Sequence, residues 1–201
     1  MMLINDTIVA ISTATGKAGI GIVRISGSLS LDIGMKMTGI HLNPRYAYFT
    51  EIKDLHGDCF DKGIVIYFKS PYSYTGEDII EFHAHGGLEI LQLILNTVIS
   101  CGGRLANAGE FTERAYLNNK IDLIQAEAVV DMINATSKQA VKSSILSLQG
   151  LFSKKLYNIV TRINNLRIYI EAVLNFPDDN IDLFGDNYIL NSLKSFCRSK
   201  F

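Results

Sequence analysis

Apolar positions in the first 120 residues change period every few residues, which is typical of short strands mixed with isolated helices. Four runs favour strands, because they are short and either rich in β-branched residues or bounded by glycines. These runs are Thr7 to Ser12, Ile20 to Ser26, Tyr46 to Ile52 and Gly63 to Phe68. Helical spacing covers Leu29 to Met37 and Leu88 to Ile99. We therefore predict an α+β domain with a mixed sheet over residues 1–120.

Beyond residue 120 the pattern becomes almost purely helical. Apolar residues recur by threes and fours from Asp122 to Leu148, and Gly150 is a plausible break. A second apolar stripe follows from Phe152 to Val173, and Pro177 is expected to end it. Two long antiparallel helices with narrow apolar stripes cannot bury themselves alone. The pattern thus predicts the first part of an incomplete helical domain over residues 121–201.

The densest polar segment lies between Ser70 and Gly87. Its second half, Glu77 to His85, alternates like a strand, so Glu81 shares one face with His83 and His85. These residue types suit zinc, but alternate positions on one strand need further ligands from elsewhere, which the sequence does not supply. We therefore expect hydrogen-bonded histidines and no metal site.

A glycine-rich segment at residues 15–24, TGKAGIGIVR, resembles a phosphate-binding loop but lacks its chemistry. A P-loop needs the spacing GxxxxGK[ST], which occurs nowhere in the chain. The glycines are better explained by a tight turn that leads into a strand. The sequence therefore predicts no nucleotide hydrolysis by this chain alone.

A third polar segment, residues 108–126, reads as a loop, a short helix, a turn and the start of a long helix. Asp122 is most simply a helix cap. Lys120 is harder to explain, because a cation just before a helix amino end opposes the helix dipole. Another role is therefore needed for this lysine.

Overall charge argues against a global attraction to nucleic acid, since 19 basic residues face 20 acidic ones. Six basic residues between 132 and 170 favour a solvated helix face over a phosphate site. The amino end lacks a secretory pattern, no apolar run is long enough for a membrane span, and the three cysteines are widely spaced. We expect a cytoplasmic protein that binds neither membrane nor DNA.

Several blocks occur in order along the chain, namely DTIVAIST, GIGIVRISG, SYTGED, HGG and GEFTERAYLNNKIDLIQAEA. Together they resemble the amino-terminal region of the MnmE (TrmE) family of tRNA-modification GTPases. The resemblance implies a fold related to tetrahydrofolate-dependent aminomethyltransferases. It also implies a homodimer that binds 5-formyltetrahydrofolate or methylenetetrahydrofolate.

Three residues match the folate contacts of that family, namely Arg24, Glu81 and Lys120. A carboxylate such as Glu81 can accept the two parallel N–H groups of the pterin edge. Arg24 and Lys120 can hold the carboxylates of the glutamyl tail, although an ordinary ion pair is the other reading of Arg24. One departure from the family is Asn107-Ala108, where Arg-Pro is more usual. Catalytic residues stay unknown.

Complete members of that family continue into a G domain that uses GTP with magnesium and potassium ions. With the FAD-dependent partner MnmG (GidA) they attach an aminomethyl-type group to the wobble uridine of tRNA, which would be an indirect or weak partner here. This chain is expected to end before the G domain. Two alternatives stay open: a stand-alone aminomethyltransferase, with Asp78 or His85 as its nucleophile or general acid, or an inactive truncated product.

Overall fold

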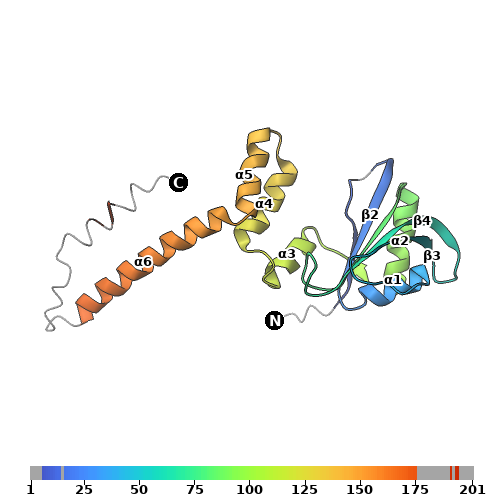
Figure 1. Ribbon diagram of the computed structural model, residues 1–201, viewed down its shortest axis with the longest axis horizontal. Helices are drawn as coiled ribbons and strands as arrows, with labels where there is room; N and C mark the ends of the chain where they lie inside the picture. Colours follow the sequence, from blue (N-terminus) through green and yellow to red (C-terminus); the bar gives the residue numbers. More distant parts are fainter. Residues whose placement is uncertain (1–5, 15, 176–190, 192, 195–201) are drawn as a thin grey trace. The chain divides into compact units, whose positions relative to one another are not determined.

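The computed structural model describes residues 6–14, 16–175, 191 and 193–194, which fall into two compact units divided after Asp122 (Figure 1). The first unit contains, in chain order, β1 (Ile8–Ile11), β2 (Ala18–Ser26), α1 (Ser30–Thr38), β3 (Ala47–Lys53), β4 (Cys59–Phe68), β5 (Ile79–Gly86), α2 (Leu88–Ser100), β6 (Arg104–Leu105) and α3 (Glu110–Leu117). The second contains α4 (Leu123–Asn134), α5 (Lys138–Leu148) and α6 (Leu151–Asn175). The predicted α+β class is confirmed.

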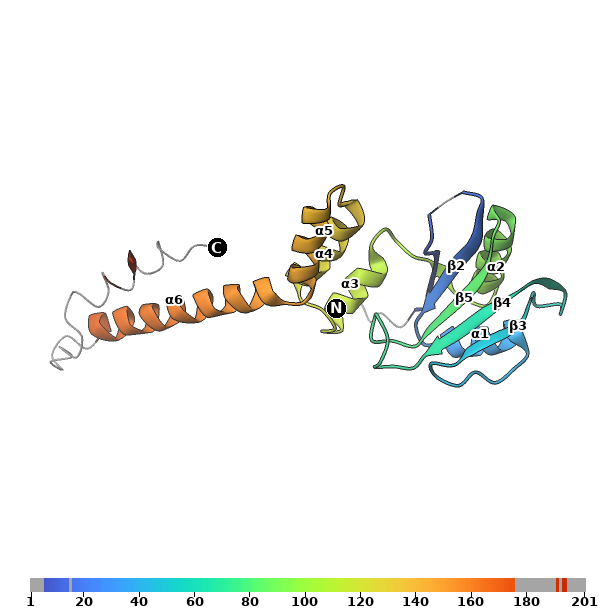
Figure 2. The same cartoon turned by 45° about the horizontal axis from the view of Figure 1, so that its top comes forward.

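The strands of the first unit form one mixed sheet in the order β3-β4-β5-β2-β1-β6. Neighbouring strands are antiparallel except β1 and β6, which run parallel. Helices α1 and α2 lie on the same face of this sheet (Figure 2). The other face is therefore free to carry polar side chains from its central strands.

Alternation along β2 and β5 decides which side chains face the helices. Val23 and Ile25 on β2, and Ile80 and Phe82 on β5, have no exposed surface and join the apolar core. The residues between them point to the open face, which places the polar residues of both strands together at the centre of the sheet. The predicted alternation of β5 is thus confirmed.

The strands differ from the prediction most at β4 and β6. β4 begins at Cys59, four residues before the predicted Gly63, because the polar stretch there pairs with the end of β3 without any apolar alternation. The short strand β6 was not predicted. It consists of Arg104 and Leu105, whose pairing with the edge of β1 needs no sequence pattern of its own.

The prediction of one continuous helix from Asp122 to Leu148 is wrong. It is interrupted after Asn134, and α5 restarts at a cap: Ser137 is extended, and its hydroxyl accepts a hydrogen bond of 3.2 Å from the amide of Ala140. The predicted break at Gly150 is confirmed, since that residue has a left-handed φ of 77° between α5 and α6. The predicted end at Pro177 lies outside the described residues.

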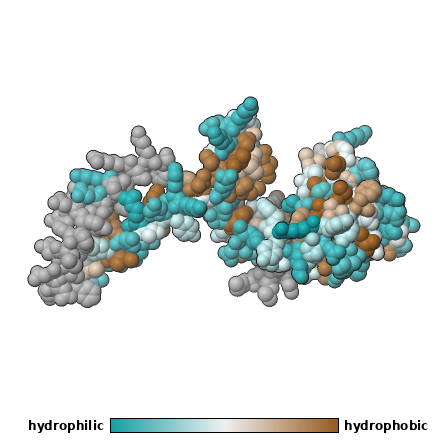
Figure 3. Space-filling model, viewed as in Figure 1, coloured by the Kyte–Doolittle hydropathy of each residue, from teal (hydrophilic) through white to brown (hydrophobic). Residues whose placement is uncertain are grey.

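Apolar residues gather on the surface of α4 and α5, which pack against each other (Figure 3). Ile133, for example, is 76% exposed, and Leu123 is 56% exposed. No helix in the described part of the chain combines the length and the apolar character that a bilayer crossing requires. These helices therefore expose apolar surface that their own packing does not bury.

Candidate functional site

An ion pair stands at the centre of the open sheet face. Arg24 on β2 lies opposite Glu81 on β5, and its Nε donates to Glu81 Oε1 at 2.8 Å while its Nη2 lies 2.7 Å from the same oxygen. Nε2 of His83 lies 3.2 Å from the other carboxylate oxygen. The side chain of Glu81 is 14% exposed and that of Arg24 is 27% exposed. The sheet thus fixes the carboxylate from two sides but leaves it open to solvent.

Two aromatic rings flank the guanidinium of Arg24. Its Cζ lies 5.5 Å from the ring centroid of Tyr74, in the loop before β5, and 5.7 Å from that of Phe111, in the first turn of α3. Both distances are typical of cation–π contacts. Sequence reasoning missed these residues, although both stand in the blocks that carry the family resemblance. The structure adds two aromatic surfaces to the predicted site.

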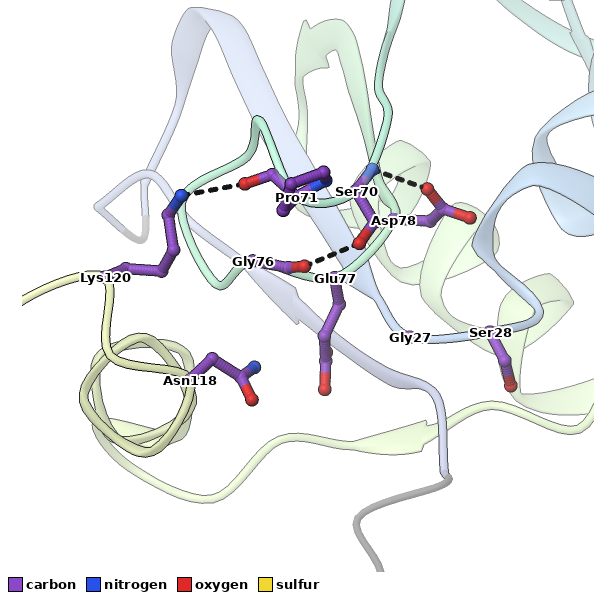
Figure 4. Close-up of a pocket in the computed structure, with 9 residues that line it drawn as sticks. All are labelled: Gly27, Ser28, Ser70, Pro71, Gly76, Glu77, Asp78, Asn118 and Lys120. Atoms are coloured by element: carbon purple, nitrogen blue, oxygen red, sulfur yellow. Dashed lines mark hydrogen bonds between the residues drawn. The ribbon is translucent and has the colours of Figure 1, made fainter.

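Lys120 lies at a pocket of about 530 Å³ rather than on the sheet (Figure 4). Its Nζ donates a hydrogen bond of 2.8 Å to the carbonyl of Pro71. The pocket is lined by Gly27, Ser28, Ser70, Pro71, Gly76, Glu77, Asp78, Asn118 and Lys120. Arg24 and Glu81 are not among its lining residues. The structure therefore brings two of the predicted site residues together and connects the third through the loop that carries both Pro71 and Tyr74.

A buried charge network holds that loop against α3. Arg114 has only 1% of its side chain exposed and donates to both oxygens of Glu77, to Glu110 and to Asp6. Hydrogen bonding by Arg104 lowers the pKa of Glu110 to about 2, against the opposing effect of partial burial. Sequence reasoning missed this network, though the i,i+4 spacing of Glu110 and Arg114 was a signal for it.

The two candidate acids of the transferase alternative have structural partners. Nδ1 of His85 lies 2.7 Å from Asp61, and His85 is 68% exposed. Burial favours a higher pKa for Asp61, but hydrogen bonds from the His85 amide and ring outweigh it and lower that pKa. Asp78 accepts from the Tyr67 hydroxyl at 2.9 Å, and burial together with this bond raises the pKa of Tyr67 to about 12. Asp78 lines the pocket beside Lys120, but its carboxylate already accepts hydrogen bonds from the Tyr67 hydroxyl and the Ser70 amide, and the ring of His85 is engaged by Asp61.

Metal binding finds no support in the described residues, where no three His, Cys, Asp or Glu side chains lie close enough to hold an ion. Glu81 and His83 are neighbours, but His85 pairs with Asp61 instead. The three polar residues that share one face of β5 therefore do not act as one ligand set.

Comparison with known proteins agrees with this architecture of an α+β unit followed by a helical unit. A family model described as the GTP-binding protein TrmE N-terminus matches residues 7–120, and a model of the MnmE helical domain matches residues 123–199. Similar proteins include the tRNA modification GTPase MnmE of Francisella philomiragia, 52% identical over 198 residues, and that of Marinobacter nauticus, 47% identical over 190.

The fold and its charged sheet face define the class of protein: a mixed-sheet domain that is followed by a helical domain. Within that class, the chain belongs to the TrmE (MnmE) family. The matches cover 98% and 94% of this chain but only 44% and 42% of those two relatives. The chain thus spans less than half the length of the curated relatives that it matches.

Proposed function

We propose that this chain is the folate-binding and dimerising portion of a tRNA-modification GTPase. Residues 1–120 would bind 5-formyltetrahydrofolate or methylenetetrahydrofolate and pair with a second copy, and residues 121–201 would contribute to a helical domain. The observation that carries this proposal is the Arg24–Glu81 pair, which holds an accessible carboxylate at the centre of an open sheet face in a chain of this family.

Glu81 suits the aminopyrimidine edge of a pterin. Arg24 directs both Nε and Nη2 at Oε1, and His83 contacts Oε2, so that Oε2 keeps a second lone pair for a ligand. Hydrogen bonds to a carboxylate are shorter and stronger than those between neutral groups. The side chain keeps 14% of its surface exposed, which leaves the carboxylate within reach of a ligand. These features support the recognition of the N–H edge of the pterin by Glu81.

Lys120 suits the anionic tail of the same ligand. Its ammonium donates to a neutral carbonyl, that of Pro71, and has two further N–H groups for a carboxylate. The pocket beside it falls in the size range of small-molecule sites. Two nitrogens of Arg24 are directed at Glu81, and its Nη1 remains to hold a carboxylate of the tail together with Lys120.

Calorimetric titration with 5-formyltetrahydrofolate tests this proposal. Glu81→Ala is expected to weaken binding at least tenfold, because it removes a charge-assisted double hydrogen bond. Glu51→Ala is the matched control, since it also removes a sheet glutamate paired with basic side chains, Lys53 and Lys62. Undetectable binding by the folded, unmodified chain would refute folate binding, and equal affinity of the two variants would refute the role of Glu81.

Exposed apolar side chains on the two outer strands β3 and β4 support self-association. Phe49 on β3 is 75% exposed, Ile64 on β4 is 39% exposed, and these two residues lie opposite each other in the sheet register. Exposed apolar surface of this kind is typical of interfaces. Sedimentation equilibrium should show a dimer that Phe49→Asp dissociates. Leu55→Asp, at an apolar position in the turn between β3 and β4 that is 52% exposed, should leave it intact.

The wider role of the chain follows from its family. We propose that it serves the modification of tRNA wobble uridines in the cytoplasm, together with an MnmG-type FAD-dependent partner, and that GTP, magnesium and potassium act in a G domain. Copurification of an MnmG-type protein with the tagged chain, and its loss on disrupting the helical unit, would support this. A partner that binds only proteins with a G domain would contradict it.

A further inference from the structure

The aromatic rings of Tyr74 and Phe111 converge on one guanidinium although they come from different elements. Tyr74 belongs to the loop before β5 and Phe111 to the first turn of α3, and both ring centroids lie within 6 Å of Arg24 Cζ. Tyr74 remains 37% exposed, and Phe111 is only half-buried. Aromatic surface is thus accessible next to the carboxylate of Glu81.

The Tyr74 ring is held in place from α3. Its hydroxyl lies 2.9 Å from the Thr112 hydroxyl, and Asn118 donates a hydrogen bond of 2.7 Å to the carbonyl of Thr75. Arg114 secures the same loop through Glu77. An aromatic side chain that is pre-positioned in this way costs little entropy when a ligand packs against it.

We propose that Tyr74 and Phe111 determine ligand specificity by stacking on the planar aminopyrimidinone half of the folate ring. This inference rests on the proposed folate site and adds the contact that the charged residues cannot supply. Glu81 contacts only the edge of the ring, and it can accept hydrogen bonds from any compound that presents two parallel N–H donors. A flat aromatic face adds the requirement for a planar ring at the same position.

A purely structural role would confine the rings to positioning Arg24 through cation–π contacts. The two roles differ in their ligand dependence. Stacking acts only on ligands that carry the pterin ring, whereas a displaced Arg24 also affects ligands that consist of the tail alone. Paired titrations with 5-formyltetrahydrofolate and with p-aminobenzoylglutamate therefore separate them.

The variants Tyr74→Ala and Phe111→Ala are each expected to weaken 5-formyltetrahydrofolate binding about 10- to 100-fold, the range found for stacking on aromatic side chains. Tyr74→Phe keeps the ring and loses only the hydroxyl contact with Thr112, so it should weaken binding less than Tyr74→Ala does. Tyr72→Ala is the matched control, because Tyr72 stands in the same loop, is 71% exposed and stacks on Arg45 instead.

A fluorescence readout covers the case in which the tail alone binds too weakly to measure. The chain contains no tryptophan, so Tyr74→Trp and Tyr72→Trp each introduce a single reporter. Adding 5-formyltetrahydrofolate should quench the fluorescence of the Tyr74→Trp variant and leave that of Tyr72→Trp nearly unchanged.

The outcomes separate this inference from the proposed function. If the unmodified chain does not bind the folate, the proposed function fails. If the unmodified chain binds the folate and both alanine variants bind it with the same affinity as the unmodified chain, the folate site stands and the stacking inference is overturned. Stacking is also overturned if the alanine variants lose as much affinity for p-aminobenzoylglutamate as for 5-formyltetrahydrofolate. Equal quenching of the two tryptophan variants by 5-formyltetrahydrofolate would overturn it as well.

Discussion

Replacing Arg114 by methionine should destabilise the first unit far more than any surface charge substitution. The substitution keeps an apolar stem of similar length but removes a guanidinium that is 1% exposed and serves Glu77, Glu110 and Asp6. Glu110 would retain Arg104 as a partner, whereas Glu77 would lose its guanidinium and keep the Ser26 hydroxyl. One half-buried carboxylate is therefore left without a counter-charge.

The magnitude follows from that count. Removing one member of a buried ion pair typically costs about 3–5 kcal/mol, and the retained Arg104 places this case near the lower limit, at about 3 kcal/mol. With a urea dependence of about 2 kcal/mol per molar, the unfolding midpoint should fall by about 1.5 M. A loss of this size is a large fraction of the stability of a typical domain.

Urea unfolding followed by circular dichroism measures the change, and amide hydrogen exchange at β1 and α3 shows where it occurs. Arg167→Met is the matched control, since Arg167 pairs with Glu171 in α6 while its side chain is 72% exposed. The control should leave the midpoint unchanged. Equal midpoints for the two variants would show that Arg114 is not the centre of a stabilising network.

Three further predictions concern the same unit. Guanidinium groups hold the pKa of Glu110 near 2, so this carboxylate contributes stability above about pH 4.5 that is lost as the pH falls towards 2. Glu110→Gln should therefore flatten the fall in melting temperature at acid pH, measured by thermal unfolding in a pH series. Burial and the hydrogen bond to Asp78 raise the pKa of Tyr67 to about 12, and the stability that this contributes is lost as the pH rises above about 10. Tyr67→Phe should remove this fall in stability at alkaline pH and the last tyrosinate step in an absorbance titration. Gly63→Ala places a methyl group 2.3 Å from a backbone oxygen of β5 and should cost about 2 kcal/mol or more in chemical unfolding, whereas Gly19→Ala, with no atom within 4 Å, should cost little.

Sequence patterns were informative where a single element carries the whole signal. The alternation of β5 separates Phe82 from Glu81 and places Glu81 on the open face without reference to any other strand. In the same way, Gly150 marks a helix boundary by its own backbone freedom. Local chemistry decided both cases, and the structure confirms both.

Contacts between distant segments could not be predicted in this way. Arg24 meets Glu81 because β2 and β5 pair in one register, and a shift by a single residue would turn one of these side chains into the core. Phe111 reaches Arg24 only because the Arg114 network fixes α3 against the loop before β5. The split between α4 and α5 was missed for another reason, since the cap at Ser137 competes with a continuous apolar pattern.

The place of β1 between β2 and β6 has a consequence for synthesis of the chain. β1 can form a hairpin with β2 as soon as Ser26 has left the ribosome, but its other edge must wait for Arg104 and Leu105, about 80 residues later. At usual translation rates this delay lasts about 4–16 s. An unpaired strand edge invites pairing with other chains during that interval. The first strand to be made is thus among the last to be enclosed, and chaperone protection matters most while residues 27 to 105 are being translated.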